Sequence, residues 1–235
     1  ICKKKPELLS IHNQERIDDY YWLNDRENPE VLNYLNSENS YTDSQMKNTE
    51  SFQKTLFNEL KSRIKEEDQS VPYLFNDYYY WSKYEKGFEH PIYLRKNKDS
   101  NIDEVILNGQ DLSKDYEFFN IGDYDISDNN QIMAYSYDTL SRRIYQIRIK
   151  NLITGELFPE TLENTTGSIV FANDNKTLFY GKKDPVTLRS FQIYAHELGT
   201  DQSKDVLIFQ EDDETFSCYA YKTKSNDYIV INSSS

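Results

Sequence analysis

The chain has 235 residues, and its 20 Tyr and 12 Phe beside only 7 Gly favour a β-rich protein whose turns are made by Asn and Asp. Its net charge of −13 argues against nucleic acid as a partner, because binding phosphates requires clustered Lys and Arg. No run approaches the roughly 18 consecutive apolar residues of a membrane-spanning helix.

Residues 1–27 are predicted to be an irregular leader. Charged and aromatic side chains are dense in Arg16–Arg26, which predicts a segment that docks its rings on another surface. Cys2 is a candidate for the lipid-bearing cysteine of a bacterial lipoprotein, but Ile1 is larger than the residue that usually precedes such a cysteine. The compartment therefore stays open between the bacterial cytoplasm and the periplasm. Cys218, within a strand-like run, is predicted to be a small core residue.

Two helices are predicted after the leader. The first begins at Pro29, because Asn28 suits the N-cap and proline suits the first helical position. The second spans Ser51–Lys65, with apolar residues at helical spacing, namely Phe52, Leu56, Phe57, Leu60 and Ile64. Pro72 ends the helical region. Residues 1–72 are thus predicted to form an N-terminal extension that packs on a partner domain.

From Tyr73 onward the sequence repeats one pattern four times: a polar turn, an aromatic strand, a loop and a mixed strand. The turn residues Asp77, Asp128, Asp174 and Asn226 are 51, 46 and 52 residues apart. A strand-built period of roughly 40–50 residues is typical of a β-propeller blade, and the alternative is a β-sandwich with evenly spaced turns. The predicted blades cover 73–110, 118–160 and 166–211, with a fourth begun at 215.

A propeller closes with roughly 4–8 blades, so three blades and the start of a fourth cannot close. Residues 73–235 are therefore expected to be an incomplete propeller domain, and the fold class to be mainly β with two helices near the N-terminus. Unfinished sheet edges and uncovered apolar faces favour self-association of such a chain.

The sequence contains no signature of a catalytic nucleophile. The Gly-x-Ser-x-Gly motif is absent, and its nearest approach, Gly167-Ser168, is assigned to a turn. His12, His90 and His196 are the only histidines, and none lies in a segment with a Ser or Cys nucleophile pattern. Each is interpreted as an ordinary surface or packing residue.

No metal or cofactor site is predicted either. His12 and Glu15 share a face, but two ligands do not specify a metal. Asp123, Asp125 and Ser127 resemble the start of a calcium loop, yet Asp128 stands where that loop needs glycine and Ala134 where it needs an acid. No glycine-rich phosphate loop occurs. The acidic run Glu211–Glu214 is interpreted as a solvated loop, with binding of a cationic substrate as the alternative.

Several stretches resemble, in order, the N-terminal half of the oligopeptidase B (protease II) branch of the prolyl oligopeptidase family of serine peptidases. They are Arg16–Arg26, Val31–Thr42, Leu60–Pro72, Tyr80–Tyr93, Ala134–Thr139, Asn151–Glu156, Phe171–Tyr180, His196–Thr200 and Glu211–Phe216. Asn24 departs from the basic residue expected at its position.

This resemblance implies a seven-bladed propeller that caps an α/β-hydrolase domain, and an N-terminal extension that also packs on that domain. It implies hydrolysis of short peptides, with preference for cleavage after Arg or Lys. The Ser-Asp-His triad and the acids that recognise the basic side chain belong to the C-terminal domain, so no catalytic residue is assigned here. The expected function is the access-restricting portion of a serine oligopeptidase; the alternative is a stand-alone propeller-like protein-binding module without activity.

Overall fold

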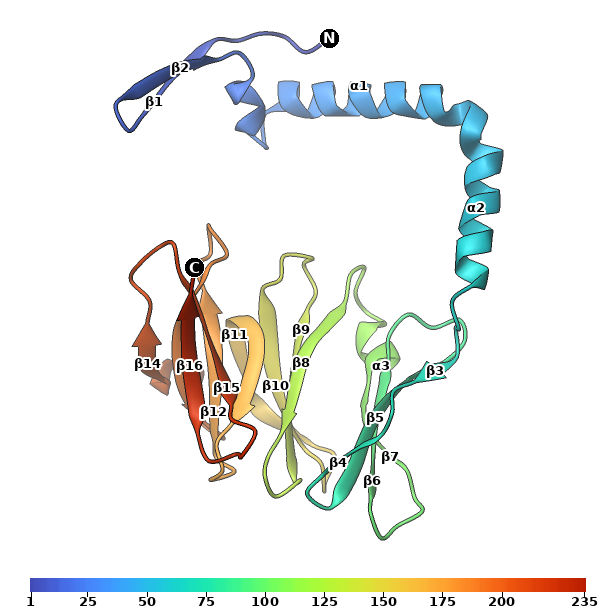
Figure 1. Ribbon diagram of the computed structural model, residues 1–235, viewed down its shortest axis with the longest axis vertical. Coiled ribbons are helices and arrows are strands. Elements are labelled where there is room, and N and C mark those ends of the chain that lie inside the picture. Colours follow the sequence, from blue (N-terminus) through green and yellow to red (C-terminus); the bar gives the residue numbers. More distant parts are fainter. The chain divides into compact units, whose positions relative to one another are not determined.

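The computed structural model describes all residues, 1–235, and divides into two compact units, Ile1–Lys65 and Glu66–Ser235 (Figure 1). The mainly β character of the chain, with its long helices near the N-terminus, is confirmed. The division falls seven residues before the predicted boundary at residue 72, because β3 (Asp68–Gln69) already pairs with β5 (Tyr78–Tyr84). No helix is both long and apolar enough to cross a membrane.

The first unit contains a hairpin that the sequence reading missed. Its leader was expected to be irregular, but β1 (Glu7–Ile11) and β2 (Gln14–Asp18) pair antiparallel. His12 and Asn13 form the turn with positive φ angles of 52° and 60°, the left-handed region that tight hairpins need. Neither residue is a glycine, so the usual sign of such a turn was missing from the sequence.

Of the leader's aromatic side chains, Trp22 packs within the first unit, whereas Tyr20 and Tyr21 are 43% and 40% exposed. After η1 (Tyr21–Asn24), the Trp22 indole donates to the Lys3 carbonyl and contacts the Tyr34 ring at 6.5 Å between centroids. The Lys5 ammonium lies 4.4 Å from the Trp22 ring centroid, within reach of a cation–π attraction. These contacts of Trp22 hold in place the segment that leads into the first long helix.

Both predicted helices are present. The first, α1 (Pro29–Met46), starts as expected: the Asn28 side chain accepts a hydrogen bond from the Glu30 backbone N–H. A short turn, η2 (Lys47–Thr49), leads to α2 (Glu50–Ser62). The predicted apolar residues of this second helix remain exposed, namely Phe52, Leu56, Phe57, Leu60 and, just beyond the helix, Ile64.

The second unit is built from antiparallel strands and one short helix. The bounds are β3 (Asp68–Gln69), β4 (Tyr73–Phe75), β5 (Tyr78–Tyr84), β6 (Ile92–Asn97), β7 (Glu104–Asn108), α3 (Gly109–Ser113), β8 (Asn120–Ile126), β9 (Ile132–Asp138), β10 (Tyr145–Asn151), β11 (Leu157–Phe171), β12 (Thr177–Lys183), β13 (Ser190–Glu197), η3 (Gln202–Lys204), β14 (Val206–Gln210), β15 (Ser217–Lys222) and β16 (Ile229–Ser234). β3 to β7 form the first sheet, and β15 with β16 begins the last.

Strand β11 belongs to two sheets. It pairs with β10 from Leu157 to Thr165 and with β12 from Thr165 to Phe171, and its register shifts between these parts. Gly167, with φ +90°, lies at the shift. Strands β8 to β14 are hydrogen-bonded in one series of seven. The shared strand β11 divides this series into two four-stranded parts, β8–β11 and β11–β14, which we call the second and third sheets. Figure 1 shows the successive sheets of the second unit as separate twisted layers side by side, unlike the two faces of a sandwich.

Apolar clusters fill the space between successive sheets. One joins the first two sheets, a larger one the second and third, and a small one the third and the last. The buried members of the first cluster are Tyr80, Ile106, Leu107, Ile126, Met133 and Tyr135. Those of the second are Ala134, Ile147, Ile149, Leu162, Ile169, Phe171, Leu178 and Tyr180. Those of the third are Val170, Ile193, Cys218 and Ala220. Cys218 is buried, as the sequence predicted.

Asparagines shape the turn that opens each repeat. Positive φ angles between 51° and 63° occur at Asn76, Asn130, Asn175 and Asn226, which confirms that Asn takes the place of Gly. These turns are also linked from sheet to sheet. Three hydrogen bonds connect them: Asn76 Nδ2 to the Asp128 carbonyl, the Asn129 N–H to Asn175 Oδ1, and Asn173 Nδ2 to the Asn226 carbonyl.

Candidate functional site

The three histidines lie in different surroundings, and none is paired with a nucleophile. His12 is exposed in the β1–β2 turn, while His90 packs edge-on against Phe119. His196, on β13, is fully buried and touches carboxylates, with no Ser or Cys hydrogen-bonded to its ring. A serine or cysteine hydrolase site is therefore not assembled by these residues.

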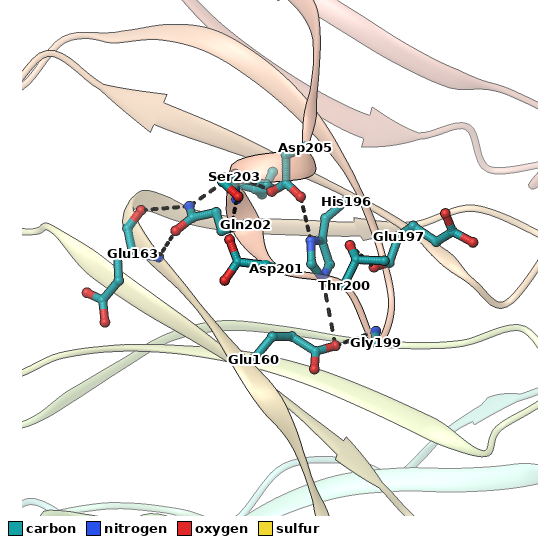
Figure 2. Close-up of polar contacts among 11 residues, drawn as sticks. Glu160, Glu163, His196, Glu197, Gly199, Thr200, Asp201, Gln202, Ser203 and Asp205 are labelled. Atoms are coloured by element: carbon teal, nitrogen blue, oxygen red, sulfur yellow. Dashed lines mark hydrogen bonds and ion pairs between the residues drawn. The ribbon is translucent and has the colours of Figure 1, made fainter.

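His196 is the centre of a buried polar cluster, shown in Figure 2. Its Nδ1 lies 2.7 Å from Asp205 Oδ1, and its Nε2 lies 3.7 Å from Glu160 Oε1. The side chains of His196, Asp205 and Glu160 are at most 5% exposed. Tyr180 donates its hydroxyl to Asp205 Oδ2 at 2.7 Å, and burial raises the pKa of Tyr180, which stays neutral.

This cluster joins the second and third sheets. Glu160 comes from the part of β11 that pairs with β10, and it accepts the Gly199 backbone N–H at 2.7 Å. Gln202 adds a second link, because its side-chain amide accepts from the Glu163 N–H and donates to the Glu163 carbonyl. An acid–imidazole–acid array resembles the orienting part of a catalytic triad, but without solvent access or a nucleophile its role is structural.

Sequence reasoning treated His196 as an ordinary packing residue and did not detect its partners. Glu160 and Asp205 are 36 and nine residues away in the chain, and neither spacing matches a known motif. Two atoms of the cluster, His196 Nε2 and Glu160 Oε2, have no hydrogen-bond partner. No group of three or more His, Cys, Asp or Glu side chains is arranged to hold a metal ion.

Asp123 and Asp125, which resembled part of a calcium loop, lie on β8 and face the next sheet. Asp125 Oδ2 accepts the Phe171 N–H at 2.7 Å, and its Oδ1 accepts the Ile126 N–H at 2.9 Å. Burial raises the pKa of Asp125 to about 6 and also raises that of Asp123. These carboxylates therefore join strands of neighbouring sheets, and Ser127 belongs to the adjoining turn, where its hydroxyl accepts the Ile132 N–H.

The acidic run Glu211–Glu214 forms an organised loop between β14 and β15. Arg189 donates to the carbonyls of Glu211 and Phe216, which holds both ends of the loop. Asp213 accepts the Thr215 N–H and hydroxyl, and these bonds lower the pKa of its carboxyl. Residues 212–214 are exposed, as expected for a solvated loop.

Comparison with protein-family models gives one match over residues 2–235, to the family described as prolyl oligopeptidase, N-terminal beta-propeller domain. Among curated proteins, the chain is 38% identical to dipeptidyl aminopeptidase BI of Pseudoxanthomonas mexicana, covering 97% of the chain and 34% of that protein. It is 31% identical to protease 2 of Moraxella lacunata, covering all of the chain and 35% of that protein.

Solved structures give the same result for the fold. Oligopeptidase B from Leishmania major matches with a TM-score of 0.91 and 27% identity over the whole chain, which covers 36% of that protein. Oligopeptidase B from Trypanosoma brucei, at 24% identity and a TM-score of 0.89, supports the fold alone. The chain thus spans about a third of the length of the relatives it matches.

Proposed function

Because the chain belongs to the prolyl oligopeptidase family, through that family's N-terminal β-propeller domain, we propose that it is the propeller and N-terminal portion of a serine oligopeptidase that hydrolyses short peptides after Arg or Lys. The observation that carries this proposal is the match of the whole chain to oligopeptidase B of Leishmania major, at a TM-score of 0.91. The catalytic residues would then belong to an α/β-hydrolase domain outside these 235 residues.

The proposal assigns residues 1–72 to an extension that packs on that hydrolase domain. Support comes from α2, whose large apolar side chains have no cover: Phe52 is 66% exposed and Phe57 is 64% exposed. Burying such side chains contributes roughly 1.5–3 kcal/mol each, so a folded partner surface is the favourable place for them.

Residues 73–235 would be three blades and the beginning of a fourth in a seven-bladed propeller. This count is supported by three sheets that end near residues 108, 165 and 210. The intervals between these ends are close to the repeat length read from the sequence. The exposed edge of the last sheet is the reason that we also expect self-association of the isolated chain.

In this function the propeller restricts access to the hydrolase site. Its sheets are joined by buried polar contacts, as at His196 and Asp125, in addition to apolar clusters. These contacts resist separation of the sheets, so a folded protein substrate would not pass between them. A short peptide could instead enter through an open end of the propeller.

The test uses the complete protein and chromogenic peptides that differ in the residue before the cleaved bond. We expect hydrolysis after Arg and Lys, weak hydrolysis after Ala or Pro, and inhibition by a serine-directed organophosphate. The 235-residue chain alone should hydrolyse none of them. Cleavage by this chain, beyond that of a mock preparation, would contradict the assignment of catalysis to another domain.

A second candidate activity is removal of dipeptides from free N-termini. It is favoured by the 38% identity to a protein named dipeptidyl aminopeptidase BI. Peptides with a free and an acetylated N-terminus separate the two: an aminopeptidase loses activity on the blocked peptide, while an endopeptidase cleaves both. The non-enzymatic alternative, a protein-binding module, predicts that the complete protein cleaves neither.

A further inference from the structure

A depression of about 460 Å³ lies between the first and second sheets, at the end where the asparagine turns are. Its lining comes from β7 on one side and from the end of β10 with the β10–β11 loop on the other. That loop is held beside the Asn130 turn, because the Leu152 N–H donates to the Gln131 carbonyl. The proposed function leaves this depression without a role.

One side of the depression carries a lysine whose charge is not balanced. Lys150 Nζ donates to the Ile106 carbonyl at 2.9 Å, a neutral group on β7, and forms no ion pair. Burial lowers the pKa of Lys150, and no carboxylate is close enough to raise it. An ammonium has three N–H groups, so two remain for a ligand. An anion bound here would supply the attraction that the protein itself does not.

A second cation, Arg95 on β6, lines the depression although it is only 2% exposed. It donates to Glu104 Oε2 at 2.8 Å and to the Asn130 carbonyl at 2.5 Å. Arg148, two residues before Lys150 on the same face of β10, adds a further positive charge, and its buried Nε has no hydrogen-bond partner. Positive charge is therefore in excess around the depression, although the chain as a whole carries −13.

The remaining lining suits a carboxylate with an apolar neighbour. Thr154 Oγ1 accepts the Glu156 N–H, which leaves its own O–H free to donate. Val105 and Ile153, which also line the depression, are 55% and 65% exposed. One unpaired ammonium balances one negative charge, which favours a carboxylate over a phosphate dianion.

We propose that this depression binds a carboxylate, held by the Lys150 ammonium and the Thr154 hydroxyl, on a ligand whose apolar part packs on Val105 and Ile153. The carboxylate can belong to the C-terminus of a peptide or to an acidic side chain. Glu104 also lines the depression, and its negative charge weakens the binding without preventing it. The affinity for a carboxylate does not depend on the proposed peptidase function.

The first experiment measures dissociation constants for the complete protein by saturation-transfer-difference NMR. N-acetyl-leucine carries a terminal carboxylate beside an apolar side chain, and N-acetyl-leucinamide is its uncharged counterpart. The α-amide of N-acetylglutamate carries only a side-chain carboxylate, so it separates the two sources. We expect at least one carboxylate probe to bind about tenfold more tightly than N-acetyl-leucinamide, as one charged hydrogen bond would give. Equal binding of all three probes overturns the site.

Three variants test whether the preference for a carboxylate arises at this depression. Lys150→Met should remove it, while Lys176→Met, at an exposed lysine in the turn before β12, should keep it. Glu104→Gln should tighten binding roughly threefold, because it removes the nearby negative charge and can still accept from Arg95. An unchanged preference in Lys150→Met, or binding to Glu104→Gln that is no tighter than to the wild type, overturns the proposal.

The second experiment needs no variant, so it decides the site even where Lys150→Met does not fold. The pH dependence of Lys150 labelling by fluorodinitrobenzene, followed by peptide mass spectrometry, measures its pKa in the complete wild-type protein. The bound carboxylate probe should raise that pKa, because an opposite charge favours the ammonium, and N-acetyl-leucinamide should not. The same pKa with and without the carboxylate probes overturns the proposal. If the complete protein cleaves no peptide, the peptidase proposal fails, and both measurements still decide the carboxylate site.

Discussion

Asp125 of β8 accepts the backbone N–H of Phe171 of β11 at 2.7 Å, so a side-chain carboxylate joins two sheets in the way a strand partner joins strands within a sheet. The carboxylate is largely removed from water, and burial raises its pKa from an ordinary 3.8 to about 6. The Lys222 ammonium opposes this shift, and the nearby Asp123 adds to it. The joint between these sheets is therefore sensitive to pH.

The first prediction concerns that sensitivity. Because the folded state holds the Asp125 proton more tightly than the unfolded state, the stability from the protonated carboxyl is fully present below about pH 4 and is lost as the pH rises through 6. Between pH 4 and pH 7 the wild type should lose about 2–3 kcal/mol of its free energy of unfolding through this group, and Asp125→Asn should not show that loss. Urea denaturation across this range checks it, with Asp128→Asn in the exposed turn as the control. Parallel pH profiles for wild type and Asp125→Asn would rule the account out.

The second prediction concerns His196. His196→Ala leaves Asp205 and Glu160 buried without the imidazole and should lower the free energy of unfolding by roughly 3–5 kcal/mol. His12→Asn, in an exposed turn that tolerates Asn, should change it by less than about 0.5 kcal/mol. Adding Glu160→Gln to His196→Ala should cost less than the sum of the single changes. Strict additivity in urea denaturation would show that the three groups do not act together.

Gly167 gives the third prediction. A Cβ at this position would lie 2.8 Å from the Tyr145 ring, and the residue has φ +90°. Gly167→Ala should therefore destabilise the protein by roughly 2–4 kcal/mol, through overpacking together with backbone strain. Gly155→Ala is the matched control, because Gly155 has φ +79° but open space around it, and should cost about 1 kcal/mol. Equal losses in thermal unfolding would mean that the Tyr145 ring moves aside.

The fourth prediction separates two roles of the turn asparagines. Asn130 and Asn226 have φ angles of 58° and 63°, which glycine adopts freely, but only Asn130 accepts the buried Tyr80 hydroxyl, at 2.9 Å. Asn130→Gly leaves that hydroxyl unpaired and should cost roughly 1–3 kcal/mol. Asn226→Gly should change stability by a few tenths of a kcal/mol. Comparison of their unfolding midpoints tests this, and similar midpoints would contradict the assigned hydrogen bond.

The sequence alone determined the features that neighbouring residues control. The Asn turns were readable because left-handed backbone is costly for most other residues, and Asn28-Pro29 marked the start of α1 because only local groups satisfy a helix end. The period of about fifty residues marked the successive sheets, and the stretches similar to oligopeptidase B, such as Arg16–Arg26, marked the family.

Only the tertiary structure decided which distant side chains meet. Glu160, His196 and Asp205 come together because β11 pairs with one sheet in its first part and with the next sheet in its second. No residue spacing in the sequence predicts that change of partner. The β1–β2 hairpin was missed for a related reason, since its turn uses His12 and Asn13 in place of glycine. Local propensity depends on adjacent residues, whereas contacts between sheets depend on how whole strands are placed, and that placement is a property of the complete packed unit.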